Sequence, residues 1–260
     1  MESGSVVSIR NLDMSYGKNQ VLKDINLEIG HGQVIGYIGP NGAGKSTTLK
    51  ILLGIVQGYT GDVRIFGEKL AAESFEYKRR IGYVPETAEI YDSLTAQEYL
   101  TFIGELYGMT FEEANDKARR MLLLFGIDKE YTARINSYSK GMKQKVLITA
   151  SLIHNPDLLF FDEPLSGLDA NSVMVFKEII SALAAQGKTV FYSSHIMDVV
   201  ERISSRIILL NEGRIVADGS FEELKSQSRD SSLESIFNKL TGFNEYQKIA
   251  DEYIATVCGA

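Results

Sequence analysis

The spacing of apolar and polar residues predicts strands over the early part of the chain. Apolar and polar residues alternate in VVSIRNL and VLKDINLEI, and the turn-forming residues 16–19 separate the two runs. An apolar run at 34–39 predicts a short strand that stops at a glycine-rich loop, and apolar residues at helical spacing predict a helix over 45–55. DVRIF then predicts a further strand, ended by Gly67.

The middle of the chain changes to the period of helices. Thr95 and Glu98 have the spacing of a capping box and predict the start of a helix. Two more helices are predicted, one over 111–125 that ends at Gly126 and one over 141–153 that ends before Asn155 and Pro156. We therefore expect a mostly helical insert at about 87–153.

Strand and helix patterns alternate again after the insert. LLFF and TVFYSS predict strands, and residues 171–185 and 197–203 predict helices. RIILLNEGRIVADG predicts a hairpin that turns at 211–213, and the tail from Phe221 onward predicts polar helices. This alternation predicts an α/β fold with a mainly parallel sheet flanked by helices.

Composition narrows the class of protein. The 260 residues are 44% hydrophobic and carry a formal net charge of −7, without a basic stripe, so nucleic acid is not an expected partner. The single cysteine, Cys258, fits a reducing compartment. We expect no signal peptide at the N-terminus, and no apolar run approaches the roughly 20 residues that span a bilayer. The sequence therefore predicts a soluble chain, whose membrane role, if any, depends on another chain.

The segment GPNGAGKS fits the phosphate-binding pattern G-x-x-x-x-G-K-[ST] and lies between a predicted strand and a predicted helix. Its glycines allow backbone N–H groups to face phosphate oxygens, and the helix N-terminus adds positive potential. Lys45 can reach the β- and γ-phosphates, and the Ser46 hydroxyl can bind Mg²⁺. The predicted nucleotide-binding residues of this loop are Gly39, Pro40, Asn41, Gly42, Ala43, Gly44, Lys45, Ser46 and Thr47.

Two carboxylates follow the apolar run LLFF. Asp162 and Glu163 end a predicted buried strand, and the carboxyl edge of an α/β sheet is where ligands bind. A pair of acids at a strand end is often only a solvated surface feature, but its presence beside a phosphate-binding loop favours catalysis. We expect Asp162 to hold Mg²⁺ through water and Glu163 to act as the general base on the attacking water.

These motifs, with SKGMKQK, SGLD and His195 in the same chain, resemble the ATPases of ABC transporters over roughly residues 5–225. The resemblance implies that Tyr16 stacks on adenine and that His195 contacts the γ-phosphate. It also implies that Ser139 and Gly141, retained from the family signature, contact the γ-phosphate of a nucleotide held by another subunit. Asp169 ends the segment SGLD, which in this family crosses the dimer interface. Alone, Tyr16 would more often be a packing tyrosine.

The sequence departs from the family pattern at several positions. Lys140 and Met142 replace a glycine and a glutamine of the signature, and Glu86 stands where the family usually has a glutamine. A glutamate should hold Mg²⁺ at least as well as a glutamine, but should repel the γ-phosphate more. VPE together with SKGM is similar to a subgroup of bacterial cassettes that pair with exporter-type permeases.

The resemblance implies an architecture, a reaction and partners. It implies a P-loop core with an antiparallel β subdomain, an ATPase domain at 1–225 and a helical extension at 226–260. The reaction is ATP hydrolysis with Mg²⁺ by a head-to-tail homodimer or heterodimer. A separate membrane permease would hold the subunit at the inner face of the cell membrane. A soluble ABC ATPase of translation or repair is the alternative. A P-loop kinase or G protein fits less well, because it has no use for SKGM or SGLD.

Four further positions lie outside these motifs. Ile90 and Tyr91 precede the predicted helix, and could belong to the core or to a groove that receives the permease. His31 and His154 are expected to have structural roles. His154 ends a predicted helix, where a protonated imidazole would suit the helix dipole.

Overall fold

The structure, a computed structural model, describes residues 4–70, 75–87, 89–228, 230, 232–242 and 246–258. In chain order the described elements are β1 (Val7–Tyr16), β2 (Asn19–Ile29), β3 (Val34–Ile38), α1 (Lys45–Leu52), β4 (Thr60–Ile65), β5 (Glu68–Lys69), η1 (Glu76–Arg80), β6 (Ile81–Val84), α2 (Ala96–Leu106), α3 (Phe111–Leu124), η2 (Asp128–Glu130), η3 (Ile135–Ser137), α4 (Lys140–Leu152), β7 (Leu158–Asp162), α5 (Ala170–Ala185), β8 (Thr189–Ser193), α6 (Met197–Ile203), β9 (Arg206–Asn211), β10 (Arg214–Gly219), α7 (Phe221–Ser228), α8 (Leu233–Thr241) and α9 (Tyr246–Cys258).

Two sheets organise these elements. A four-stranded antiparallel sheet has the order β2-β1-β4-β5, and a six-stranded sheet has the order β10-β9-β3-β8-β7-β6. Only β10 is antiparallel in the larger sheet. The predicted hairpin of β9 and β10, the antiparallel N-terminal strands and the mainly parallel sheet are therefore confirmed.

The larger sheet lies between two hydrophobic cores, and β7 shows how one strand serves both. Leu158 and Phe160 belong to the cluster shared with the antiparallel sheet and α1. Leu159 and Phe161 belong to the cluster shared with the helical insert and α5. Because successive side chains of a strand point to opposite faces, a strand buried on both faces is apolar throughout. This explains the uninterrupted run LLFF.

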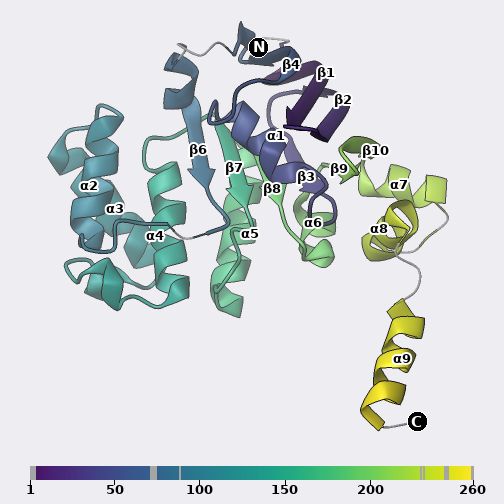
Figure 1. Ribbon diagram of the computed structural model, residues 1–260. Coiled ribbons are helices and arrows are strands. Elements are labelled where there is room, and N and C mark those ends of the chain that lie inside the picture. The colour runs from purple at the N-terminus through teal and green to yellow at the C-terminus, as the bar shows by residue number, and fades with distance from the viewer. Residues whose placement is uncertain are drawn as a thin grey trace.

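The helical insert comprises α2, α3 and α4, which form one side of the molecule in Figure 1. The capping box predicted at α2 is present: the Thr95 hydroxyl accepts from the Glu98 N–H, and the Glu98 carboxylate accepts from the Thr95 N–H. Thr110 and Glu113 cap α3 in the same way. These reciprocal bonds satisfy N–H groups that a helix start otherwise leaves unpaired, and so fix where each helix begins.

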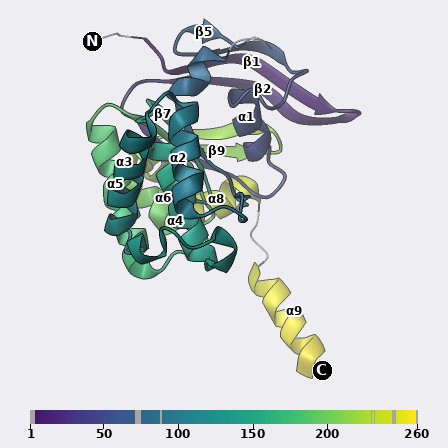
Figure 2. The same cartoon turned by 90° about the vertical axis from the view of Figure 1, so that its left-hand side faces the viewer.

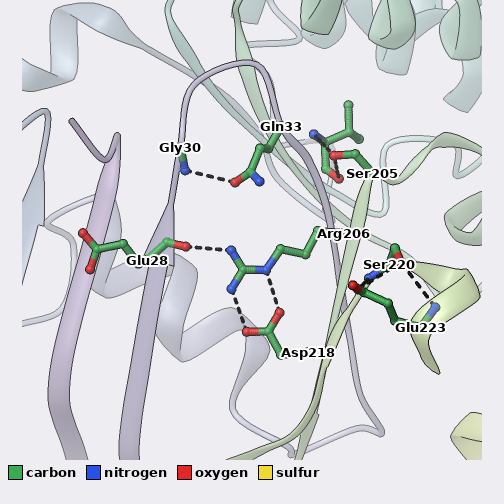
Figure 3. Close-up of polar contacts among 9 residues, drawn as sticks. Glu28, Gly30, Gln33, Ser205, Arg206, Asp218, Ser220 and Glu223 are labelled. Carbon is green, nitrogen blue, oxygen red and sulfur yellow. Dashed lines mark hydrogen bonds and ion pairs between the residues drawn. The ribbon is translucent and has the colours of Figure 1, made fainter. Parts of the chain in front are cut away.

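Arg206 of β9 joins the larger sheet to β2 of the antiparallel sheet (Figure 3). Its guanidinium makes two bonds to Asp218 on the neighbouring strand, of 2.6 and 2.7 Å, and a third of 2.7 Å to the Glu28 carbonyl at the end of β2. The planar fork of arginine suits such a bidentate pair. Close by, Ser220 and Glu223 form the cap of α7.

The C-terminal helices differ in how they pack. The predicted boundary between the ATPase domain and the C-terminal extension, at 225/226, falls inside α7. Leu233 and Ile236 of α8 are buried in the same core as the helical insert. In contrast, α9 lies apart from the other elements in both views (Figures 1 and 2), and Ile249 and Tyr253 on it are exposed. Among the residues described, none of the helices combines the length and apolar character needed to cross a bilayer.

His154 does not have the protonated, dipole-stabilising role expected from its position. It is half-buried and stacks on Tyr107 with ring centroids 3.6 Å apart, and its Nε2 lies 2.9 Å from the Ile81 carbonyl oxygen. Its Nδ1 is buried and has no hydrogen-bond partner among the residues that the structure describes, so a second N–H would have no acceptor there. Burial lowers the pKa of the imidazole, which is therefore neutral at pH 7.

Acid should weaken the fold through this residue. Below about pH 6.5 the unfolded chain protonates His154 while the folded chain resists protonation. The contribution of neutral His154 to the free energy of unfolding is therefore complete above that pH. It is lost as the pH falls through the lower pKa that His154 has in the folded chain. We expect His154→Gln to make the free energy of unfolding less dependent on pH between about 6.5 and 5. Urea unfolding of both proteins across this range measures the difference, and parallel pH profiles would contradict it.

Candidate functional site

The phosphate-binding loop lies between β3 and α1, as predicted. All five residues of β3 are buried, and α1 begins at Lys45, directly after the left-handed Gly44. A Cβ on Gly44 would lie 2.6 Å from Leu22 Cδ2, and one on Gly39 would lie 2.2 Å from the Leu210 carbonyl oxygen. Both positions therefore require glycine for space, and Gly44 also for its φ of +108°.

Lys45 is held inside this loop. Its Nζ donates to the carbonyl oxygens of Gly39 and Pro40 at 2.7 and 3.1 Å. Burial lowers the pKa of the ammonium, and the nearby carboxylates, led by Asp162, raise it in turn. The loop thus presents a partly desolvated cation, which would attract phosphate strongly.

Asp162 and Glu163 lie at the carboxyl end of β7, facing the loop. Asp162 is buried and accepts a short hydrogen bond from the Ser193 hydroxyl. Glu163 has a left-handed backbone with φ of +47°, and its carboxylate accepts from the Ser194 hydroxyl at 3.2 Å. Burial raises the pKa of both acids. For Glu163, the nearby His195 is the largest opposing influence.

His195 lies next to Glu163, with Nε2 3.6 Å from Glu163 Oε1. That carboxylate oxygen is buried and has no hydrogen-bond partner in the described part of the chain. An unpaired buried oxygen is costly unless water or a ligand satisfies it. Because Glu163 also lines a cleft, this oxygen remains available as an acceptor for a water or ligand bound there.

One cleft gathers most of the residues predicted to bind or hydrolyse nucleotide. It is lined by Val21, Asn41, Gly42, Gly44, Lys45, Ser46, Thr47, Glu86, Asp162, Glu163 and His195. The predicted residues Gly39, Pro40 and Ala43 form the loop but do not line the cleft, and neither does Tyr16, which is 49% exposed at the end of β1.

Three residues of the site were missed from the sequence. Val21 lines the cleft from β2, and Ser193 and Ser194 bind the two acids. The only signal for the serines was their place at the end of the predicted strand TVFYSS, directly before His195. For Val21 there was none, because its position depends on how the antiparallel sheet folds over the loop.

Ser139, Gly141 and Asp169 lie outside this cleft. The Ser139 hydroxyl caps α4 by accepting from the Met142 N–H, so it has a structural role in the single chain. Asp169 caps α5 and pairs with Lys145 at 3.3 Å, and its hydrogen bonds to Ser172, with help from Lys145, lower the pKa of its carboxyl. Within one chain none of these three residues lines the cleft beside the phosphate-binding loop.

The donor set of the cleft fits a nucleotide with Mg²⁺. The helix start at Lys45 and the flanking glycines offer backbone N–H groups to phosphate. Ser46, Glu86 and Asp162 offer hydroxyl and carboxylate oxygens, the ligands that Mg²⁺ prefers. The arrangement suits phosphoryl transfer to a water held by Glu163.

Comparison with known proteins agrees with this geometry. The family described as ABC transporter matches residues 22–166. The linearmycin resistance ATP-binding protein of Bacillus subtilis (strain 168) is 34% identical over 97% of this chain and 80% of its own length. A solved ATP-binding subunit of an ABC transporter has a TM-score of 0.85 and 31% identity, covering 91% of this chain and all of that one. A dimeric ATP-binding cassette in a post-hydrolysis state with ADP and Pi has a TM-score of 0.74 and 26% identity, covering 82% and 98%.

Proposed function

Because the chain belongs to the ABC transporter family, as an ATP-binding subunit that hydrolyses ATP, we propose that it drives export of a substrate through a separate membrane permease. The observation that carries the mechanism is the convergence of the phosphate-binding loop, Asp162, Glu163 and His195 on one cleft. The direction of transport is supported by the relative named for linearmycin resistance. At the membrane, the permease would hold the chain at the inner face.

The loop N–H groups and six side chains of the cleft have proposed parts in hydrolysis. Loop N–H groups and the Lys45 ammonium stabilise the charge that develops on the phosphates. Glu163 takes a proton from the attacking water, and His195 holds the γ-phosphate in place. Mg²⁺, held by Ser46, Asp162 and Glu86, would neutralise phosphate charge when bound.

The proposed working unit is a dimer. Ser139 and Gly141 lie outside the cleft of their own chain, so they can act only on a nucleotide held by another subunit. Two chains head to tail would complete two such sites, as the dimeric cassette among the structural relatives suggests. Asp169 and the segment that precedes it would lie at that interface, and Tyr16 would stack on the adenine ring.

We propose that the permease docks in a groove between β6 and the helical insert. Tyr83, Tyr99, Ile103 and Tyr107 line this groove. Tyr91 lies at its border, 66% exposed, with its ring centroid 6.5 Å from that of the buried Tyr99. An exposed aromatic beside an apolar groove is typical of a binding anchor.

Replacing Tyr91 by alanine should separate hydrolysis from assembly. Because the side chain is largely exposed, Tyr91→Ala should leave ATP hydrolysis by the free subunit within about twofold of the original rate. Loss of a binding anchor, in contrast, should weaken co-purification with the permease by about tenfold or more. The paired measurement is hydrolysis by the free subunit and recovery of the permease.

Leu124→Ala on α3 is the matched control, since Leu124 is 79% exposed and does not line the groove. Equal loss of both activities in Tyr91→Ala would indicate a packing role. Unchanged assembly would rule out docking at this residue.

Export itself is testable in inverted membrane vesicles that contain the chain and its co-purified permease, with linearmycin as the probe. We expect accumulation that requires ATP. Failure of a tagged chain to retain any membrane protein would contradict the proposal. Uptake of the probe only in right-side-out vesicles would show that transport runs inward instead of outward.

A further inference from the structure

Helix α4 contacts the segment that follows Glu163 through a buried amide. Gln144 is only 1% exposed, and its Nε2 donates to the Pro164 carbonyl oxygen at 2.9 Å. Pro164 directly follows Glu163, whose backbone is in the left-handed region. A buried hydrogen bond at this point restricts the peptide between Pro164 and Leu165, one residue after Glu163, because a broken bond would leave the Pro164 carbonyl unpaired.

Two lysines of the same helix bind the rest of the segment. The Lys140 Nζ donates to the Ser166 hydroxyl at 2.6 Å, and the Lys145 Nζ lies 3.3 Å from Asp169 Oδ2. Lys145 is 12% exposed and also donates to the Phe125 carbonyl, which ties the segment to the end of α3. The three contacts hold residues 164, 166 and 169 in turn.

Two glycines allow this close approach. A Cβ on Gly141 would lie 2.4 Å from the Gly167 carbonyl oxygen. Gly167 has a φ of +81°, and a Cβ there would lie 2.9 Å from Lys140 Cγ. Gly141 is therefore needed for packing inside one chain, whatever it does at a dimer interface.

We propose that Gln144, Lys140 and Lys145 are positioning residues that hold the segment 163–169 against α4 and so keep Glu163 aimed at the attacking water. The inference rests on the proposed role of Glu163 as the general base. Its consequence is that a movement of α4, the helix that begins at the signature, is transmitted directly to the base of the same chain. Misplacement of a catalytic group by as little as about 1 Å lowers rates strongly.

Gln144→Met keeps the size and helix preference of the side chain but removes the amide donor. We expect kcat for ATP hydrolysis to fall about tenfold or more, with the Kd for ATP within about twofold. Amide hydrogen exchange of residues 165–169 in the nucleotide-free chain should become about fivefold faster. Lys140 is exposed, so Lys140→Met should lower kcat and speed amide exchange less than Gln144→Met does. Lys140→Arg should retain the original kcat.

Lys143→Met is the matched control, because Lys143 lies on the same helix and faces Asp92, at 4.0 Å, instead of the segment. We expect it to retain the original rate and exchange. In single-turnover hydrolysis, Gln144→Met should lower the residual rate of the Glu163→Gln protein by less than about twofold, since both act through one group.

If Gln144→Met and Glu163→Gln lowered the single-turnover rate independently of each other, the proposal would be overturned. Unchanged amide exchange in both Gln144→Met and Lys140→Met would overturn it too. A weaker Kd for ATP with unchanged kcat would instead place these residues on the nucleotide. If Glu163→Gln alone hydrolyses ATP at the original rate, the role of Glu163 fails. The exchange measurement then still decides whether α4 holds the segment.

Discussion

Replacing Glu163 by glutamine is expected to leave ATP binding intact and to slow hydrolysis by about 10²–10⁴-fold. The amide has nearly the same shape as the carboxylate and can still accept from the Ser194 hydroxyl, but it cannot take a proton from water. Burial raises the pKa of Glu163, which makes the carboxylate a better proton acceptor than an exposed glutamate. The protein should therefore accumulate as an ATP-bound dimer. Steady-state hydrolysis, nucleotide binding and gel filtration with ATP measure the three parts of this prediction.

Glu178→Gln on α5 is a suitable control, because it makes the same chemical change outside the cleft. Glu178→Gln should retain the original rate of ATP hydrolysis, and its oligomeric state in gel filtration should match that of the original chain. Hydrolysis by Glu163→Gln at the original rate would remove Glu163 from the role of general base.

Lys45→Ala should lose most of the affinity for ATP, by about tenfold or more, together with useful hydrolysis. The ammonium is partly buried and fixed by two carbonyl oxygens, so its charge is already placed where phosphate would bind. Alanine removes that charge and leaves the carboxylates of Asp162 and Glu163 unbalanced, which should repel phosphate further. Titration with a fluorescent ATP analogue, together with phosphate release, measures both effects.

Lys50→Ala in the last turn of α1 removes a similar charge from an exposed position on the same helix. We expect near-original affinity from it. If Lys45→Ala bound and hydrolysed ATP as the original chain does, residues 39–47 would not be the phosphate-binding loop.

Much of the fold could be predicted because it depends on local patterns. The capping box at Thr95 marks the start of α2, and the apolar run of β7 follows from burial on both faces. The phosphate-binding loop was also visible, since its glycines and Lys45 must follow one another closely. Their positions relative to a strand and a helix are confirmed.

Contacts between distant segments could not be predicted in this way. His154 appeared to be a helix-end cation, and its stacking on Tyr107 and bond to the Ile81 carbonyl depend on packing across the insert. The bond from Gln144 to Pro164 likewise joins residues whose spacing in sequence carries no period. Such contacts depend on how completed elements meet, and a single sequence contains no local signal of that.

The order of strands in the larger sheet also bears on how the chain is made. β3, which carries the phosphate-binding loop, pairs with β8 through Val34 and Val190, and with β9 through Ile35 and Arg206. Its partners are therefore translated long after it, and at about 5–20 residues per second they follow roughly ten to thirty seconds later. Until then the two edges of β3 have unpaired backbone N–H and C=O groups, and contacts of such long range form slowly. The nascent subunit can therefore complete its ATP site only after β8 and β9 have been synthesised, and we expect the chain to depend most on chaperones before that point.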